Sequence, residues 1–113
     1  MHELSIATGI IEIVVEEAEK AAAGKVTRVE VEIGSIAGIE KEALLFSWDV
    51  VREGTIARQA PLVVRDVPAI AECLECHHQF HLEHPLAVCP DCLSVKYRII
   101  QGKELRVSAL EVE

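Results

Sequence analysis

The four cysteines of the chain form two C-x-x-C pairs, Cys73 with Cys76 and Cys89 with Cys92, and twelve residues separate the pairs. Each C-x-x-C turn can present two thiolates from one tight bend, and structural Zn²⁺ sites bind four such ligands tetrahedrally. The spacing therefore predicts a four-cysteine zinc site with a closed coordination sphere, which is structural and not catalytic. Two alternatives remain open: four free thiols, or iron in a rubredoxin-like site, because four thiolates also suit iron.

Histidines are concentrated in the loop between the two cysteine pairs, at His77, His78, His81 and His84. They could place imidazoles close to the metal or form a weak second site for a divalent ion. We favour a solvated polar loop, since four thiolates already satisfy one ion and nothing in the sequence directs the rings to a common point.

His2 is a second candidate for metal chemistry because it is the second residue of the chain. Its imidazole and the neighbouring backbone nitrogens could close five- and six-membered chelate rings around Ni²⁺ or Cu²⁺, for which square-planar nitrogen donors are typical. The amine of Met1 could add a donor. An incidental histidine is the alternative interpretation.

The charge of the chain limits its partners. Nineteen acidic and eleven basic residues give a formal net charge of −8. Nucleic-acid binding is disfavoured, because affinity for DNA or RNA depends largely on Lys and Arg neutralising phosphates. No apolar run approaches the roughly 20 residues of a membrane span, and Met1 to Leu4 lack the start of a secretion signal. We expect a cytoplasmic protein with reduced thiols.

Catalytic patterns are missing from the sequence. It contains no Ser/His/Asp or Cys/His nucleophile set, no phosphate-binding glycine loop, and no metal site with three ligands and an open position. We therefore do not expect an enzyme.

The elements that position these residues follow from hydrophobic periodicity. An amphipathic helix is predicted from Ile6, with Ile10, Ile13, Val14 and Ala18 on its apolar face and Gly24 as its end. Alternation over residues 28–33 predicts a strand, and residues 40–53 predict a second helix with Leu44, Trp48 and Val51 inside. Strands are expected at 62–67 and 105–112, the latter with a bulge near Ala109 and Leu110.

These elements indicate an α+β fold, a small mixed sheet of about three strands with two helices on one face. The cysteines lie between the last two predicted strands, so the zinc segment is an insertion. The expected organisation is one domain of residues 1–69 plus 101–113, and an inserted zinc-ribbon domain of residues 70–100.

The whole chain resembles the hydrogenase maturation nickel chaperones of the HypA/HybF family. The matching features are Met1-His2-Glu3 opening directly into a helix, Ile33-Gly34, the complete cysteine frame and the segment from Gln101 to Leu105. The resemblance implies a nickel-binding α/β domain containing the inserted zinc domain. It also implies that His2 binds nickel, that Glu3 lies in the nickel shell, and that the four cysteines hold zinc.

The resemblance further implies a function and partners. The protein would bind Ni²⁺ as cargo and deliver it, with a HypB-like GTPase, to the large subunit of a [NiFe]-hydrogenase, and urease maturation proteins are further candidate partners. Glu40 matches an acidic position near nickel in some members, although a carboxylate at a helix N-terminus is favoured in any case. A zinc-ribbon adaptor that carries no nickel is the alternative function.

One departure from the family pattern concerns the cysteine pairs. Some members carry one histidine two residues after the second cysteine and another directly after the fourth. His78 matches the first position, but Leu93 occupies the second. A ligand exchange that needs both histidines is therefore not expected here.

Overall fold

The chain forms two compact units in a computed structural model that describes residues 2–84 and 86–113. One unit comprises Met1–Glu32, Ile39–Arg65 and Arg106–Glu113, and the other comprises Ile33–Gly38 and Asp66–Leu105. These bounds do not test which part binds which metal, so the predicted nickel-binding and zinc-binding domains stay predictions. Met1, predicted as an additional nickel donor, lies outside the described residues.

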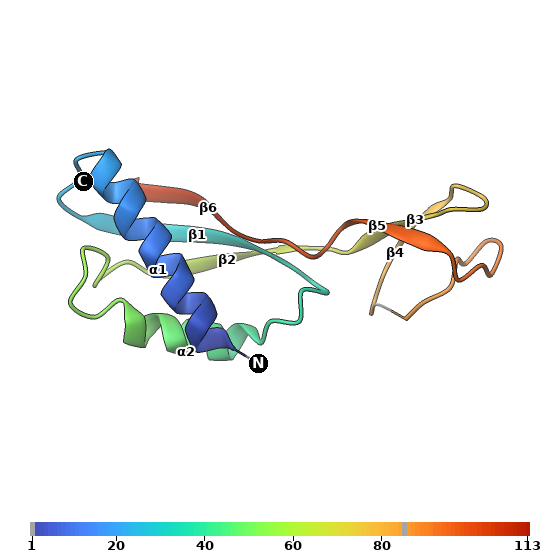
Figure 1. Cartoon of the computed structure of the whole chain (residues 1–113), viewed down its shortest axis with the longest axis horizontal. Coiled ribbons are helices and arrows are strands. Elements are labelled where there is room, and N and C mark those ends of the chain that lie inside the picture. Colours follow the sequence, from blue (N-terminus) through green and yellow to red (C-terminus); the bar gives the residue numbers. More distant parts are fainter. Residues whose placement is uncertain (1, 85) are drawn as a thin grey trace. The chain divides into compact units, whose positions relative to one another are not determined.

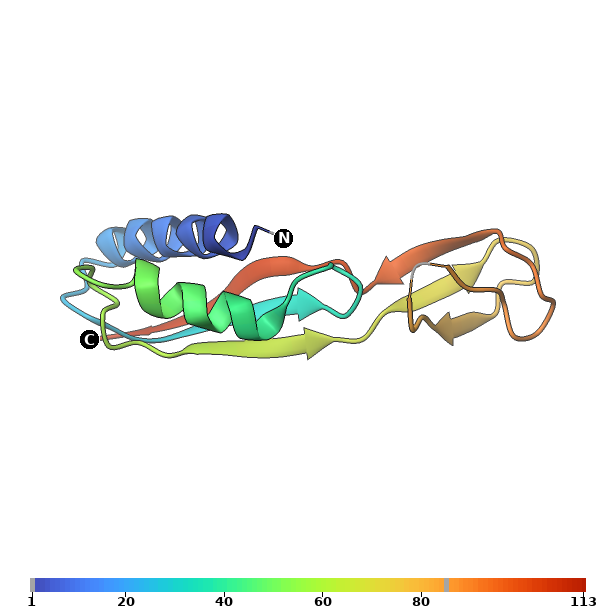
Figure 2. The same ribbon diagram turned by 90° about the horizontal axis from the view of Figure 1, so that it is seen from below.

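The first unit consists of two helices on one face of a sheet (Figures 1 and 2). The helices are α1 (Glu3–Lys20) and α2 (Lys41–Val51). The strands are β1 (Val26–Gly34), β2 (Leu62–Val67) and β6 (Leu105–Val112), in the order β2-β1-β6. This arrangement confirms the predicted α+β class with two helices covering a small sheet.

The sheet is mixed in direction. The amides of Val29 and Ser35 donate to Pro61 O and Val67 O, so β1 and β2 run in parallel and α2 lies in the connection between them. Lys25 exchanges both backbone hydrogen bonds with Glu113, and Gly34 N donates to Glu104 O, so β6 is antiparallel to β1. Both strands advance nine residues between these pairs. Hydrogen-bonded pairs of a regular antiparallel ladder recur every two residues, so this odd separation does not exclude an irregularity, and the expected bulge near Ala109 and Leu110 stays a prediction.

The helix α1 buries an apolar stripe that includes Ala7, Ile10, Ile11, Val14 and Ala18. The predicted stripe was wrong at Ile13, which is 46% exposed. Isoleucines lie on both sides of the central stripe, so periodicity alone does not separate Ile11 from Ile13. The helix ends before Gly24, because Ala22 takes a left-handed φ of 52° and Ala23 N donates to Ala18 O, which closes the C-terminus as a Schellman motif.

Alternation along β1 separates the two faces of the sheet. Val29 and Val31 are fully buried beneath the helices. Glu30 and Glu32 point to the other face, where Arg65 of β2 and Arg106 of β6 pair with them at distances from 2.6 to 3.9 Å. These pairs keep the uncovered face polar.

The core of the first unit is centred on α2. Leu44 and Trp48 are buried as predicted, and the indole Nε1 of Trp48 donates to Ala60 O at 2.9 Å. That bond satisfies the buried indole N–H and fixes the loop that leads into β2.

The second unit contains three short strands that the periodicity of the sequence did not predict. They are β3 (Ile70–Cys73), β4 (Gln79–His81) and β5 (Tyr97–Gln101), and they form an antiparallel sheet in the order β4-β3-β5. The register shifts between Ile70 and Ala71, which leaves Ile100 as an extra residue in β5.

The core of this second sheet is small. Its buried members are Ala69, Ala71, Cys73, Phe80, Leu82 and Cys89. The ring of Tyr97 packs edge-on against Phe80, with 5.9 Å between the ring centroids. Two of the six buried side chains are cysteines, so the candidate metal site is part of the hydrophobic core.

Gly34 and Gly102 allow two backbone segments to approach each other closely. A Cβ atom on Gly34 would overlap the carbonyl of Gly102. Gly102 itself takes a φ of +122°, and a Cβ there would lie 2.5 Å from the Cβ of Ala69. The amides of Gly34 and Ile36 donate to Glu104 O and Gly102 O at 2.8 and 3.0 Å, so two backbone hydrogen bonds join the segments at this contact.

Candidate metal centre

The two C-x-x-C turns have the same backbone geometry. In the first turn, His77 N donates to Cys73 O and Cys73 N donates to His78 O. In the second turn, Leu93 N donates to Cys89 O and Cys89 N donates to Ser94 O. The residue after each second cysteine takes a left-handed φ, 65° at His77 and 62° at Leu93. A left-handed φ is unfavourable for residues other than glycine, and neither His77 nor Leu93 is a glycine. The surrounding hydrogen bonds must therefore stabilise both turns.

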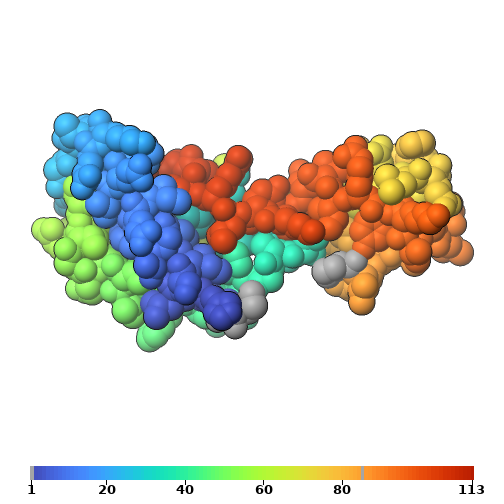
Figure 3. All heavy atoms as spheres, in the orientation of Figure 1, coloured from blue at the N-terminus to red at the C-terminus, as the bar shows by residue number. Residues whose placement is uncertain are grey.

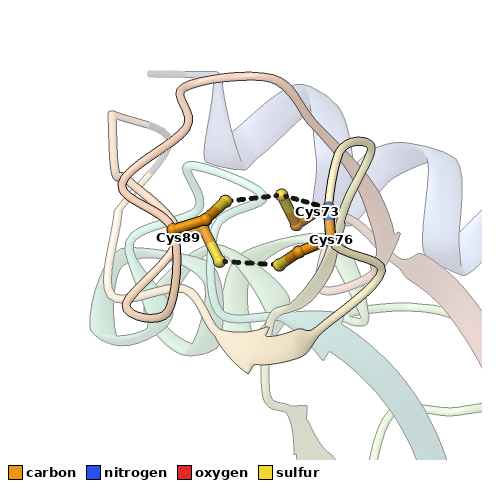
Figure 4. A group of neighbouring side chains, drawn as sticks. Cys73, Cys76 and Cys89 are labelled. Carbon is orange, nitrogen blue, oxygen red and sulfur yellow. Dashed lines mark hydrogen bonds between the residues drawn. The ribbon is translucent and has the colours of Figure 1, made fainter.

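The four thiols converge on a common point, as the prediction from their spacing requires. Each Sγ lies within 4.8 Å of every other. The sulfurs of Cys73 and Cys92 are 3.5 Å apart, and those of Cys76 and Cys89 are 3.6 Å apart. Figure 4 shows the thiols of Cys73, Cys76 and Cys89 pointing toward one another. A tetrahedral ion with Zn–S bonds of about 2.3 Å needs S···S edges of about 3.8 Å, so the cluster fits such an ion.

Burial and backbone donors differ between the cysteines. Cys73 and Cys89 are fully buried, whereas Cys76 and Cys92 are exposed. The amides of Glu75 and Cys76 point at the Sγ of Cys73, at 3.4 and 3.5 Å. These donors would stabilise a thiolate at Cys73, and they follow from the C-x-x-C turn itself.

The backbone N–H of Cys76 is the main cause that lowers the pKa of Cys73 to about 6, with further help from the Glu75 amide and the neighbouring thiols. The Ser94 amide lowers the pKa of Cys92, but the hydrogen bond with Cys73 and the other neighbouring thiols outweigh it and raise this pKa to about 12. The lowered pKa of Cys73 favours its thiolate form, which is the form that binds a metal cation.

The histidine loop contributes no ligand to this cluster. Within residues 2–84 and 86–113, the only group of metal-ligating side chains that converges is the cysteine quartet. His78 Nδ1 lies 3.2 Å from Asp91 Oδ2, and His84 Nδ1 accepts a hydrogen bond from Leu86 N. The contact between His78 and Asp91 joins the two cysteine turns, and local sequence patterns gave no signal for it.

His2 lies at the N-cap of α1, and its side chain is exposed. Its carbonyl accepts the first helical hydrogen bond from Ile6 N at 2.9 Å. The first backbone N–H groups of a helix have no partner within the helix, so nitrogens at residues 2 and 3 can bind a ligand without breaking the helical ladder.

Glu3 connects the starts of the two helices. Its side chain is 7% exposed, and Oε2 accepts a hydrogen bond from Glu40 N at 3.1 Å. Glu40 is the N-cap residue of α2 and is itself exposed. The hydrogen bond from the Glu40 amide is the main cause that lowers the pKa of Glu3 below its ordinary value of 4.5. This carboxylate therefore has a structural partner, and its predicted place in a nickel shell stays a prediction.

The lowered pKa of Glu3 predicts a loss of stability in acid. A carboxyl whose pKa is lower in the folded state stabilises the fold above its unfolded pKa, and this contribution disappears as the pH falls through the folded value. The decline should therefore begin near pH 4.5 and continue below it. Glu3→Gln should flatten this part of the curve of unfolding free energy against pH, measured by urea denaturation. Glu42→Gln in the first turn of α2 is the control, and an equal flattening in that variant would contradict the assignment to Glu3.

The fold and the site define a small α+β protein with a second unit that is organised around a four-cysteine metal site. A family model described as "Hydrogenase/urease nickel incorporation, metallochaperone, hypA" matches residues 1–112. The chain therefore belongs to the HypA family of nickel metallochaperones, which serve nickel incorporation and are not enzymes.

Relatives cover the chain from end to end. The hydrogenase maturation factor HypA of Rhodobacter capsulatus is 41% identical over 112 residues, which are 99% of each chain. The HypA of Acidithiobacillus ferrooxidans is 42% identical over 113 residues, all of both chains. The solution structure of the Ni metallochaperone HypA from Helicobacter pylori has a TM-score of 0.72 and 32% identity, and the match covers 99% of this chain and 97% of that one.

Proposed function

We propose that the chain binds Ni²⁺ at its N-terminus and delivers it, with a partner GTPase, to the large subunit of a [NiFe]-hydrogenase. The observation that carries this proposal is the exposed imidazole of His2 beside the first amides of α1, which have no acceptor within the helical ladder. Imidazole and backbone nitrogens are donors that suit Ni²⁺. Glu3 and the exposed Glu40 supply negative charge next to this donor set.

An exposed donor set suits the transfer of an ion. A chaperone must release its cargo, and a few donors at the end of a helix leave open positions for the ligands of an acceptor. Cu²⁺ binds nitrogen donors more strongly than Ni²⁺ does, so selectivity would depend on metal supply and on the partners. We place this transfer in the cytoplasm, and urease maturation proteins are a second class of partner. No helix within the described residues is long and apolar enough to cross a membrane.

The four cysteines hold zinc in this proposal. Their convergence and the burial of Cys73 and Cys89 fit a tetrahedral thiolate site with no open position. Bound zinc would hold the two turns together and stabilise the second unit. Metal analysis of purified protein separates this assignment from iron, since an iron site would be coloured.

Titration of Ni²⁺ into untagged protein tests the nickel proposal. His2→Ala should weaken nickel binding by about 100-fold or more, because it removes a direct ligand and the chelate rings that the ligand closes. His81→Ala is the matched control, an exposed histidine outside the proposed site. Zinc content should be the same in all three proteins. Equal nickel affinity in His2→Ala would refute the terminal site and favour a zinc-ribbon adaptor.

A further inference from the structure

The outer face of α2 carries exposed apolar side chains that neither metal site uses. Phe46 is 72% exposed and Val50 is 54% exposed. The spacing of four residues places them one turn apart on the same side of the helix. Leu44 and Trp48 lie on the opposite side and are buried in the core. The fold therefore does not explain why Phe46 and Val50 are apolar.

Phe46 is unusual among the aromatic residues of this chain. The sequence contains four aromatic residues. Trp48 and Phe80 are 1% and 8% exposed, and Tyr97 packs against Phe80. In the space-filling view, part of the green α2 segment reaches the surface beside the blue α1 (Figure 3). Exposed aromatic side chains are enriched among the residues that dominate binding at protein interfaces.

An acidic row runs beside this apolar pair. Glu42, Asp49 and Glu53 are exposed. The spacing of seven residues places Glu42 and Asp49 on one side of α2, and Glu53 follows in the turn after the C-cap residue Arg52. Asp49 pairs with Arg52 at 3.0 Å, and Arg52 also donates to Ala60 O at 2.7 Å, which directs its guanidinium toward the protein. The row is therefore acidic in balance, in agreement with the net charge of −8.

We infer that this face of α2 is a docking surface for a basic amphipathic helix of a partner protein. Apolar side chains of such a helix would cover Phe46 and Val50, and flanking Lys or Arg would pair with Glu42 and Glu53. A second copy of this chain fits poorly, because it would bring two acidic rows and two strongly negative molecules together. The inference does not depend on nickel binding at His2.

The test uses the full zinc-loaded chain and a designed probe. The probe is a fluorescent helical peptide of about 18 residues with a leucine stripe flanked by lysines, and the control peptide carries glutamate in place of lysine. Fluorescence anisotropy should show saturable binding of the lysine peptide only. Phe46→Ala should weaken this binding by about tenfold or more. Glu42→Gln combined with Glu53→Gln should also weaken it and reduce its salt dependence.

Matched variants make the result specific to this face. Ile13→Ala removes an exposed apolar side chain from α1 and should leave peptide binding unchanged. Trp48 fluorescence reports whether each variant keeps its core. The inference is overturned if wild-type protein shows no saturable binding, if Phe46→Ala binds as well as wild type, or if the glutamate peptide binds equally. Self-association that disappears in Phe46→Ala would assign the face to a second copy and would also overturn it.

Discussion

Removal of the metal from the four-cysteine site should unfold the second unit and leave the first unit folded. The second unit has a core of six buried side chains, and two of them are the ligands Cys73 and Cys89. Units of about 40 residues usually need a metal or disulfides, because they bury too little apolar surface to offset the loss of chain entropy. Zinc binding in small domains contributes about 10–16 kcal/mol at neutral pH, and most of this is folding free energy.

Cys89→Ala should have the same effect as a chelator. The variant removes a buried ligand and would leave three thiols around the ion. Hydrogen exchange offers a local measurement, since Cys73 N donates to His78 O and Leu82 N donates to Ala69 O within the second unit. Both amides should lose their protection in Cys89→Ala and in wild-type protein treated with EDTA. Added Zn²⁺ should restore protection in the wild type.

Trp48 reports on the first unit in the same experiment. It is the only tryptophan, and its indole is buried and hydrogen-bonded to Ala60 O. Its emission should therefore remain that of a buried indole after chelation. His81→Ala, which changes an exposed side chain of β4, should behave as wild type. Protected Cys73 and Leu82 amides after complete zinc removal would show that the apolar core alone folds this unit.

The long elements of the first unit could be predicted from the sequence because their patterns extend over many residues. The strands at Leu62–Val67 and Leu105–Val112 have the predicted bounds. The burial of Trp48 was also predicted, since the residues around it repeat with helical spacing. The three strands of the second unit were missed because they have three to five residues each, too few for a period.

The candidate site could also be predicted only in part from the sequence. The C-x-x-C spacing predicts convergence of the four cysteines, because each turn determines the positions of two sulfurs by itself. The contact between Glu3 and the Glu40 amide joins residues 37 positions apart, and no local pattern indicates it. This contact ties the start of α1 to the start of α2 and thereby restrains the backbone next to His2. A side chain expected near nickel therefore has a second role as an anchor for the N-terminus.

Gly34→Ala should destabilise the protein by about 3 kcal/mol or more, because the new methyl group would overlap the backbone of Gly102. Backbone atoms cannot move aside as a flexible side chain can, so the two segments would have to separate. Separation would lengthen the bonds from Gly34 N to Glu104 O and from Ile36 N to Gly102 O. The same substitution at Gly9 is the control, since nothing lies within 4 Å of a Cβ there.

Gly9→Ala should instead stabilise the protein by about 0.5–1 kcal/mol, the ordinary gain for alanine over glycine inside a helix. Thermal unfolding followed by circular dichroism measures both changes, and hydrogen exchange at the Ser35 and Ile36 amides localises the first. Protection at these amides should fall in Gly34→Ala and remain unchanged in Gly9→Ala. Stability equal to wild type in Gly34→Ala would mean that the segments around Gly34 and Gly102 can separate at little cost, and that their close contact does not hold β1 and β6 together at this end.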